Sequence, residues 1–181
     1  MKSYFKLLVT LFVLSTVLSC KSTKSTEGSP KYQLIENDEF SFKLLDTWFG
    51  YESHGYTNYS PKKLRNKMVR HQSNFAITSY DKNPEESMED LMVRHGNQTY
   101  KSDPNPEISF KTTDSKYGKV YIKEQVTTWN LFTFKETSYY YNINDKIVHV
   151  TFHATIDKYD TYVNDFRFML NSLSILKNTE E

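Results

Sequence analysis

Histidine has the most varied chemistry in this chain, because it can bind a metal ion or move a proton near neutral pH. Of the five histidines, His149 and His153 are four residues apart in a run with strand character, which separates them by roughly 13 Å at about 3.3 Å per residue. A zinc–nitrogen bond is only about 2.1 Å long, so one ion cannot be bound directly by both. His54, His71 and His95 show no ligand-like spacing. We therefore expect no metal site and no cofactor, and we interpret the histidines as solvated or hydrogen-bonded.

The sequence also gives little support for nucleophilic or acid–base catalysis. The chain has no Gly-x-Ser-x-Gly nucleophile elbow, and its five glycines form no phosphate-binding loop. Asp46 and Glu52 flank a tryptophan turn, and we interpret them as solvated. Residues 85–90 carry four carboxylates at an expected helix start, where acidic groups complement the helix dipole. We expect no catalytic residue.

An aromatic, glycine-punctuated and irregular segment at residues 48–59 is a candidate binding surface. Its rings would line a groove for a sugar, lipid or peptide, or alternatively cover the open edge of a small core. The candidate ligand or partner surface consists of Trp48, Tyr51, His54, Tyr56 and Tyr59.

A basic segment follows at residues 61–71, with five Lys and Arg residues and no acid. On a tethered domain it would face anionic lipid headgroups, where each cation contributes up to about 1 kcal/mol. The alternative is a solvated loop or an edge strand protected by lysines. The candidate membrane-facing patch is Lys62, Lys63, Arg65, Lys67 and Arg70.

The single cysteine, Cys20, lies where an apolar run meets a polar tract. Residues 1–19 contain two cations, an apolar stretch of twelve residues and a small residue, Ser19, at the end, which is typical of a secretory signal peptide. Twelve residues rise only about 18 Å as a helix, well short of a hydrocarbon core of roughly 30 Å. We therefore expect the signal to be removed.

The residues Val17, Leu18, Ser19 and Cys20 resemble the lipobox of bacterial lipoproteins, although a smaller residue is commoner at position 18. The resemblance implies a diacylglycerol on the thiol of Cys20, cleavage before it, and acylation of the new amino group. Several acyl chains make release from a bilayer rare. The alternative is an ordinary secreted protein with a chance cysteine.

The mature chain has the composition of one small globular domain. With Cys20 acylated, no cysteine remains for a disulfide. Removal of Lys2 and Lys6 reduces the 23 basic residues to 21 against 22 acidic ones, a net charge of −1 that does not favour nucleic acid. Residues 20–30 are expected to form a lipidated flexible tether, because residues 21–30 have no hydrophobic side chain. Residues 31–181 are expected to form a single domain.

Strand patterns dominate this domain. Residues 40–44 alternate with period two and can pair with residues 32–36, and residues 75–80 form a further strand. Residues 108–113, 119–129, 131–142 and 146–156 are β-rich runs joined by short connections, which favours consecutive antiparallel hairpins.

Two helices are predicted. Asn83, Pro84 and Glu86 form a capping box that predicts a helix start, followed by an apolar stripe that ends near Gly96. A second amphipathic helix within residues 159–173 should pack on the apolar face of residues 148–156. Asp157 or Asp160 can begin it. Together the elements predict an α+β fold in which an antiparallel sheet is sandwiched by α-helices.

The layout resembles PsbP-like proteins. Residues 40–48 are similar to their opening strand and tryptophan turn, and residues 139–142, 148–152 and 159–173 are similar to their closing hairpin, helix and short strand. The resemblance implies an antiparallel sheet between helices, an α/β/α sandwich shared by a photosystem II extrinsic subunit, a Ran-binding nuclear import factor and small bacterial lipoproteins. It also implies a binding or assembly-assisting domain without a general catalytic apparatus.

Two functional hypotheses follow. The first is a non-enzymatic membrane-anchored lipoprotein, held on the lipid bilayer by acylated Cys20, that binds a partner protein or small molecule. The alternative is a small envelope hydrolase that acts on glycans or lipids, with residues 48–59 as its cleft. Lys21 is not the aspartate that retains many lipoproteins at the inner membrane. By analogy we expect the periplasmic face of the outer membrane.

Overall fold

The computed structural model describes residues 29–53, 55–66, 69–99, 106–129 and 131–176. In these residues a large antiparallel sheet has the strand order β3-β4-β5-β9-β8-β7-β6. Its strands are β3 (Trp48–Ser53), β4 (Tyr56–Pro61), β5 (Ser73–Asp81), β9 (Lys146–Thr155), β8 (Phe132–Ile143), β7 (Gly118–Trp129) and β6 (Glu107–Ser115).

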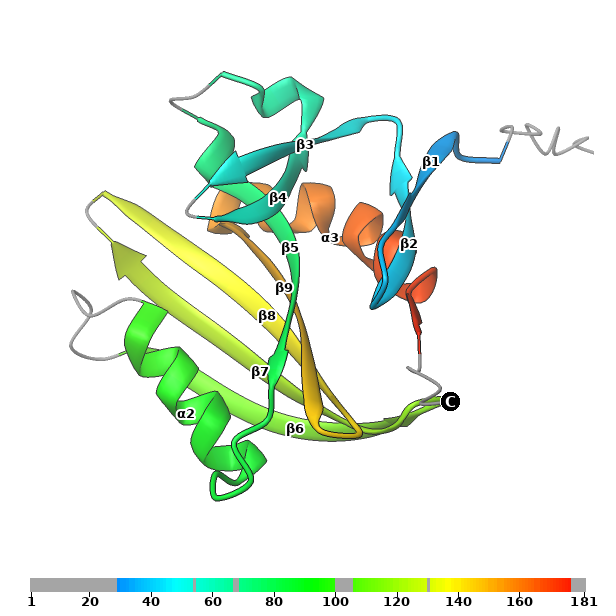
Figure 1. The fold of residues 1–181 in the computed structure, drawn as a ribbon. Helices are drawn as coiled ribbons and strands as arrows, with labels where there is room; N and C mark the ends of the chain where they lie inside the picture. Colours follow the sequence, from blue (N-terminus) through cyan, green and yellow to red (C-terminus); the bar gives the residue numbers. More distant parts are fainter. Residues whose placement is uncertain (1–28, 54, 67–68, 100–105, 130, 177–181) are drawn as a thin grey trace, which may run out of the picture.

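A small antiparallel sheet and two helices complete this part of the chain (Figure 1). The small sheet has β2 (Phe40–Leu45) between β1 (Tyr32–Glu36) and β10 (Ser174–Ile175). Helix α3 (Ile156–Asn171) packs between the large sheet and β2, and α2 (Met88–Thr99) contacts β7 on the opposite face. Short 3-10 turns, η1 (Lys62–Leu64) and η2 (Arg70–Gln72), connect β4 to β5. The predicted α+β class is confirmed.

The main core lies between α3 and the large sheet. Period-two alternation places Val148, Val150 and Phe152 of β9 on the face toward α3, and all three are buried. The rings of Phe152 and Phe166 stack with centroids 4.9 Å apart. The predicted packing of the closing helix on this strand is therefore confirmed.

The predicted start and end of the first helix were wrong. The Asn83 side chain accepts a hydrogen bond from the Glu85 backbone in a turn, and α2 begins only at Met88. Ser87 caps it instead: its hydroxyl accepts from the Asp90 backbone N–H at 3.1 Å and donates to the Asp90 carboxylate at 2.7 Å. This second capping motif lies nearer the apolar stripe than the first. The helix also continues past Gly96 to Thr99.

Candidate functional site

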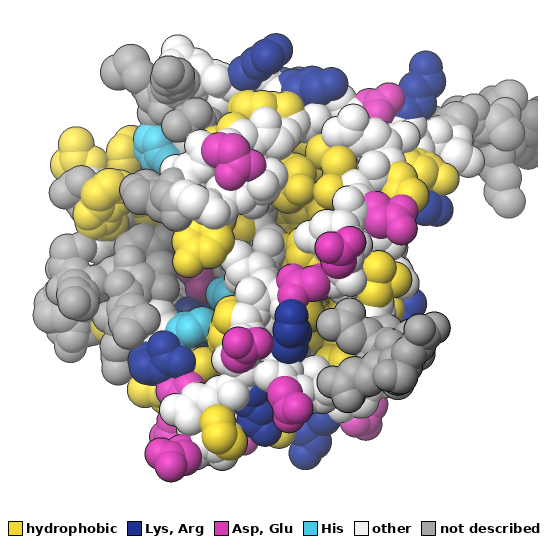
Figure 2. Space-filling model, in the orientation of Figure 1, with side chains coloured by type: hydrophobic (Ala, Val, Ile, Leu, Met, Phe, Trp, Pro, Cys, Tyr) yellow, Lys and Arg dark blue, Asp and Glu magenta, His cyan; other side chains and the backbone are white. Residues whose placement is uncertain are grey.

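The face of the large sheet opposite α3 carries a polar depression. Helix α2 covers only part of this face, and beside it lies a hollow of about 610 Å³ that adjoins a smaller one of about 230 Å³. The two share Asn58, Ala76, His95, His149 and Thr151, and we call them together the polar hollow. Its other lining residues are Tyr56, Asn74, Thr78, Ser79, Tyr80, Arg94, Lys123, Glu136 and His153. Figure 2 shows histidine side chains exposed near lysine or arginine on the viewed face.

Strand alternation places these polar side chains on one face. In β9 the core residues alternate with His149, Thr151 and His153, which point to the opposite side. The register pairs His153 with Glu136 of β8 and with Asn74 of β5. The neighbouring strands therefore bring polar side chains from distant parts of the chain into one cluster.

A buried ion pair forms part of this cluster. The Lys123 ammonium lies 2.8 Å from a Glu136 carboxylate oxygen, and their side chains are 1% and 7% exposed. Lys123 also donates to the Gln125 side chain at 2.9 Å, and Glu136 accepts from the Ser138 hydroxyl at 2.9 Å. Burial opposes ionisation of Glu136, but the charge and hydrogen bond of Lys123 outweigh it and lower the pKa of that carboxyl. The two charges therefore neutralise each other inside the fold.

Aromatic rings and imidazoles pack beside the ion pair. Tyr140 and His149 stack with centroids 4.4 Å apart, and the His95 ring lies 5.3 Å from that of His149. Burial, reinforced by His95, lowers the pKa of His149 to about 3. Burial is also the main cause that lowers the pKa of His95 and of His153. All three imidazoles are therefore neutral at pH 7.

Four buried polar atoms of residues that line the hollow have no hydrogen-bond partner within the described ranges: His149 Nε2, Asn74 Oδ1 and the hydroxyls of Tyr80 and Ser79. Burial raises the pKa of Tyr80, so its hydroxyl keeps its proton. Most buried polar atoms in folded proteins find a partner in the protein, in water or in a ligand. These atoms, His149 Nε2 and the Tyr80 hydroxyl among them, are positions where a bound molecule can complete the hydrogen bonding.

The charges around the hollow are balanced. Arg94, at its rim, donates to both carboxylate oxygens of Glu86, at 2.7 and 2.8 Å. Lys123 is paired with Glu136. Since each of these cations faces a carboxylate and the histidines are neutral, the hollow suits an uncharged polar molecule better than an ion.

The residues of the predicted aromatic surface do not form one surface in the structure. Trp48 is 1% exposed and donates through Nε1 to Asp165 at 2.8 Å, and Tyr59 is also buried in the main core. These two rings therefore fit the core-packing alternative rather than a groove. Tyr51 accepts a hydrogen bond from Asn74, and exposed Tyr56 lines the polar hollow.

The other residues predicted as sites either lie away from the polar hollow or fall outside the described residues. Lys62 and Lys63 are exposed on η1, and Arg65 is exposed with its guanidinium 5.7 Å from the centre of the Phe49 ring. Arg70 begins η2, and its side chain is not described. Cys20, His54 and Lys67 lie outside the described residues.

The sequence predicted solvated or hydrogen-bonded histidines, whereas Nε2 of His149 is buried without a partner in the described residues. It also did not show the cluster that three of the histidines form with Tyr80, Lys123 and Glu136. The period-two pattern of β9 was a usable signal, because it assigned His149, Thr151 and His153 to the face away from the core. His95 comes from α2, and spacing along the chain does not show that this helix lies against that face.

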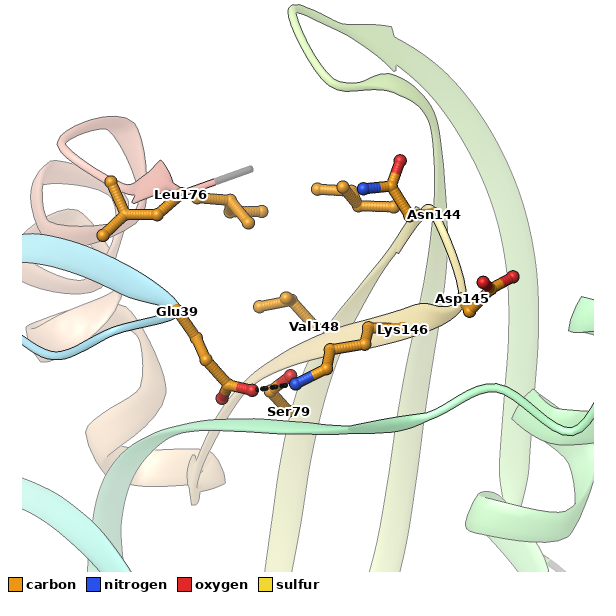
Figure 3. A pocket seen from close by; sticks show the side chains of 9 residues that line it. Glu39, Ser79, Asn144, Asp145, Lys146, Val148 and Leu176 are labelled. Carbon is orange, nitrogen blue, oxygen red and sulfur yellow. Dashed lines mark hydrogen bonds and ion pairs between the residues drawn. The ribbon is translucent and has the colours of Figure 1, made fainter. Parts of the chain in front are cut away.

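A second pocket, of about 290 Å³, lies near the β8–β9 turn (Figure 3). An ion pair between Lys146 and Glu39 crosses it, and its apolar wall includes Val148 and Leu176, the last residue described. The two charges satisfy each other, as the dashed line in Figure 3 marks. We therefore assign the candidate site to the polar hollow, where His149 and Tyr80 lack partners.

A scan against protein-family models and a search of curated protein sequences return no match. A search of solved structures does. The cyanobacterial PsbP protein, CyanoP, of Synechocystis sp. PCC 6803 matches with a TM-score of 0.63 over 83% of this chain and 96% of that one, at 13% identity. The fold is PsbP-like.

Two further structures have the same fold. LpqN of Mycobacterium tuberculosis, a protein involved in cell envelope biogenesis, matches with a TM-score of 0.56 at 9% identity, over 83% of this chain and 93% of LpqN. A protein of unknown function from Pseudomonas aeruginosa matches with a TM-score of 0.52 at 9% identity, over 81% of this chain and 99% of that one. The PsbP-like resemblance noted in the sequence is confirmed for the fold. Neither α2 nor α3, the α-helices of the described part, is long and apolar enough to cross a membrane.

Proposed function

We propose that the chain is a membrane-anchored lipoprotein of the cell envelope, acylated at Cys20, whose PsbP-like domain binds a small uncharged polar ligand in the polar hollow. The pattern of residues 17–20 after an apolar run supports the anchor. The fold shared with LpqN, an envelope biogenesis protein, supports the compartment. We propose the periplasmic face of the outer membrane as its location.

The observation that carries the binding proposal is the unpartnered pair of His149 Nε2 and the Tyr80 hydroxyl in a charge-balanced hollow. A neutral imidazole nitrogen accepts or donates according to its tautomer, and a phenol does both. A sugar or another polyhydroxyl compound offers hydroxyls with the same versatility. An ion would instead add a charge that no described group in the hollow is free to balance, because Lys123 and Arg94 are each paired with a carboxylate.

The protonation of the hollow supports binding rather than catalysis. A general acid or base works best with a pKa near the working pH. The pKa of His149 is lowered to about 3, that of Glu136 is lowered, and that of Tyr80 is raised. Each group is thus held in one protonation state at neutral pH, and we propose that the domain is not an enzyme.

Titration with sugars tests the ligand class. We expect N-acetylglucosamine or maltose to shift the amide resonances of β5 and β9 in an isotope-labelled chain that begins at residue 20 and carries Cys20→Ser. Loss of one hydrogen bond of about 1 kcal/mol in Tyr80→Phe should weaken this binding roughly five- to tenfold. Tyr32→Phe, which alters an exposed tyrosine of β1, serves as the matched control. Preferential binding of glucuronate, or no shift at the hollow with any of these sugars, would contradict the proposal.

Acylation is tested separately. Cells that express the full chain and are fed labelled palmitate should incorporate the label into this protein and retain it in the membrane fraction. Cys20→Ala should abolish the label and release the protein from the membrane, because no other cysteine is available. Equal labelling of the full chain and of Cys20→Ala would refute the proposed anchor but would leave the binding proposal unaffected.

A further inference from the structure

Exposed hydrophobic side chains gather at one end of the large sheet. Leu131 is 95% exposed, Ile156 59%, Trp129 44% and Phe132 39%. The register pairs Trp129 with Phe132 at the β7–β8 connection, and Phe134 with Thr155, next to Ile156. The four residues therefore lie at the same sheet end, and we call them the apolar tip.

The exposed cations of η1 lie at this same end. The start of β5, at Ser73, pairs with Ala154 near the end of β9, and η2 packs against β9, β5 and β4 just before it. The His71 ring of η2 lies edge-on to Phe132, with centroids 5.7 Å apart. Figure 2 shows hydrophobic side chains beside a histidine at the upper left, and lysine or arginine side chains along the top.

These cations are not neutralised within the domain. In the described part of the chain, no carboxylate lies within ion-pair distance of Lys62, Lys63 or Arg65. Residues 61–71 contain no acid. Asp157, beside Ile156, is paired with Lys158 at 3.1 Å. The end of the domain thus combines an apolar tip with unpaired positive charge.

The start of the domain is linked to η1 by backbone hydrogen bonds. The Asp46 backbone N–H donates to the carbonyl of Lys31 at 3.0 Å, and the Lys62 backbone N–H donates to the carbonyl of Thr47 at 2.8 Å. Because Asp46 and Thr47 are consecutive residues, these two hydrogen bonds place Lys31 close to Lys62, the first residue of η1. A chain that enters at residue 31 from a lipid anchor would bring η1 toward the membrane.

From this arrangement we propose that the domain docks on an anionic bilayer through the apolar tip and the cations Lys62, Lys63 and Arg65. Leu131 and Trp129 enter the boundary between headgroups and acyl chains, and the cations contact lipid phosphates. Tryptophan, phenylalanine and leucine are typical of apolar faces that are buried at that boundary, and basic residues are attracted to anionic lipids. The closeness of Lys31 to η1 supports this orientation of the domain only if Cys20 is acylated, as proposed above. The apolar tip and the three cations are present whether or not Cys20 is acylated.

Vesicle binding without the acyl chain tests the proposal. The chain that begins at residue 20 with Cys20→Ser should sediment with vesicles containing phosphatidylglycerol and much less with phosphatidylcholine alone. Leu131→Asp should lower the partition coefficient by about tenfold or more, because a nearly fully exposed leucine loses its transfer into the lipid. Val93→Asp, at an exposed apolar residue of α2, is the matched control and should bind like the parent chain.

Fluorescence shows which end touches lipid. The chain has two tryptophans, and Trp48 is buried, so Trp48→Phe leaves Trp129 as the reporter. Brominated acyl chains should quench this emission, and Lys62→Glu combined with Lys63→Glu should abolish the effect. Vesicle binding without Trp129 quenching would overturn the proposal. So would concentration-dependent self-association that Leu131→Asp removes, which would assign the tip to a second copy of the chain.

Discussion

Replacement of Glu136 by glutamine is expected to lower the free energy of unfolding by about 3–5 kcal/mol, the typical cost of breaking a buried ion pair from one side. The Lys123 ammonium would keep its hydrogen bond to Gln125 but lose the carboxylate 2.8 Å away. The Lys123 side chain is 1% exposed, so water cannot solvate its ammonium in place of the lost carboxylate. Urea denaturation followed by circular dichroism gives the difference directly.

Two comparisons separate charge burial from a general effect of the substitution. Lys111 and Glu124 form an ion pair at 2.7 Å on the surface, with side chains 55% and 40% exposed. Glu124→Gln should therefore cost no more than about 1 kcal/mol. The double variant Lys123→Met with Glu136→Leu should recover most of the stability lost in Glu136→Gln, because no unpaired charge remains. If Glu136→Gln lowers the free energy of unfolding no more than Glu124→Gln does, then the Lys123–Glu136 pair is not buried in solution, contrary to the structure.

The ion pair also bears on the function of the hollow. Since apolar side chains of similar volume often stabilise a fold as well as a buried ion pair does, stability alone does not explain its presence. The pair fixes the positions of Gln125 and Ser138, and the Ser138 hydroxyl lies 3.0 Å from that of Thr151 in the wall of the hollow. We therefore expect the apolar double variant to fold but to bind sugars more weakly than the parent chain.

The fold was predictable from the sequence because local patterns decide most of it. Alternation identified β2 and β9, and helical spacing identified the face of α3 that packs on β9. The expectation that residues 48–59 are irregular was wrong, because most of them form the paired strands β3 and β4. The start of α2 was not predictable with the same accuracy, because Asn83 and Ser87 both begin capping motifs and only one continues into the helix.

The candidate site was less predictable because it depends on contacts between elements. Lys123 and Glu136 meet across β7 and β8, so their pairing depends on the register of that hairpin. His95 reaches His149 only because α2 lies against the polar face of the sheet. Neither relation is a spacing along the chain. The period-two rule identifies which side chains share a face, but not which helix covers them.

Acidification is expected to destabilise the domain through His149. Its pKa in the folded protein is lowered to about 3 from an ordinary 6.5, so the unfolded chain binds the proton more readily. The contribution of neutral His149 is therefore fully present above pH 6.5 and is lost as the pH falls toward 3. The slope approaches about 1.4 kcal/mol per pH unit, and the total is at most about 4–5 kcal/mol.

The variant His149→Phe isolates this contribution, because a phenyl ring can keep the stack on Tyr140, now at 4.4 Å, without titrating. Free energies of unfolding measured by urea at a series of pH values should fall less steeply for His149→Phe than for the parent chain between pH 6.5 and 4. Carboxylates such as Glu136 titrate in both proteins, so the difference between the two curves belongs to the histidine. Tyr140→Phe alters the other ring of the stack and should keep the parent slope. Parallel curves for His149→Phe and the parent chain would mean that this imidazole is hydrated or hydrogen-bonded in solution, and the hollow would then lose the unpartnered nitrogen that its ligand is proposed to meet.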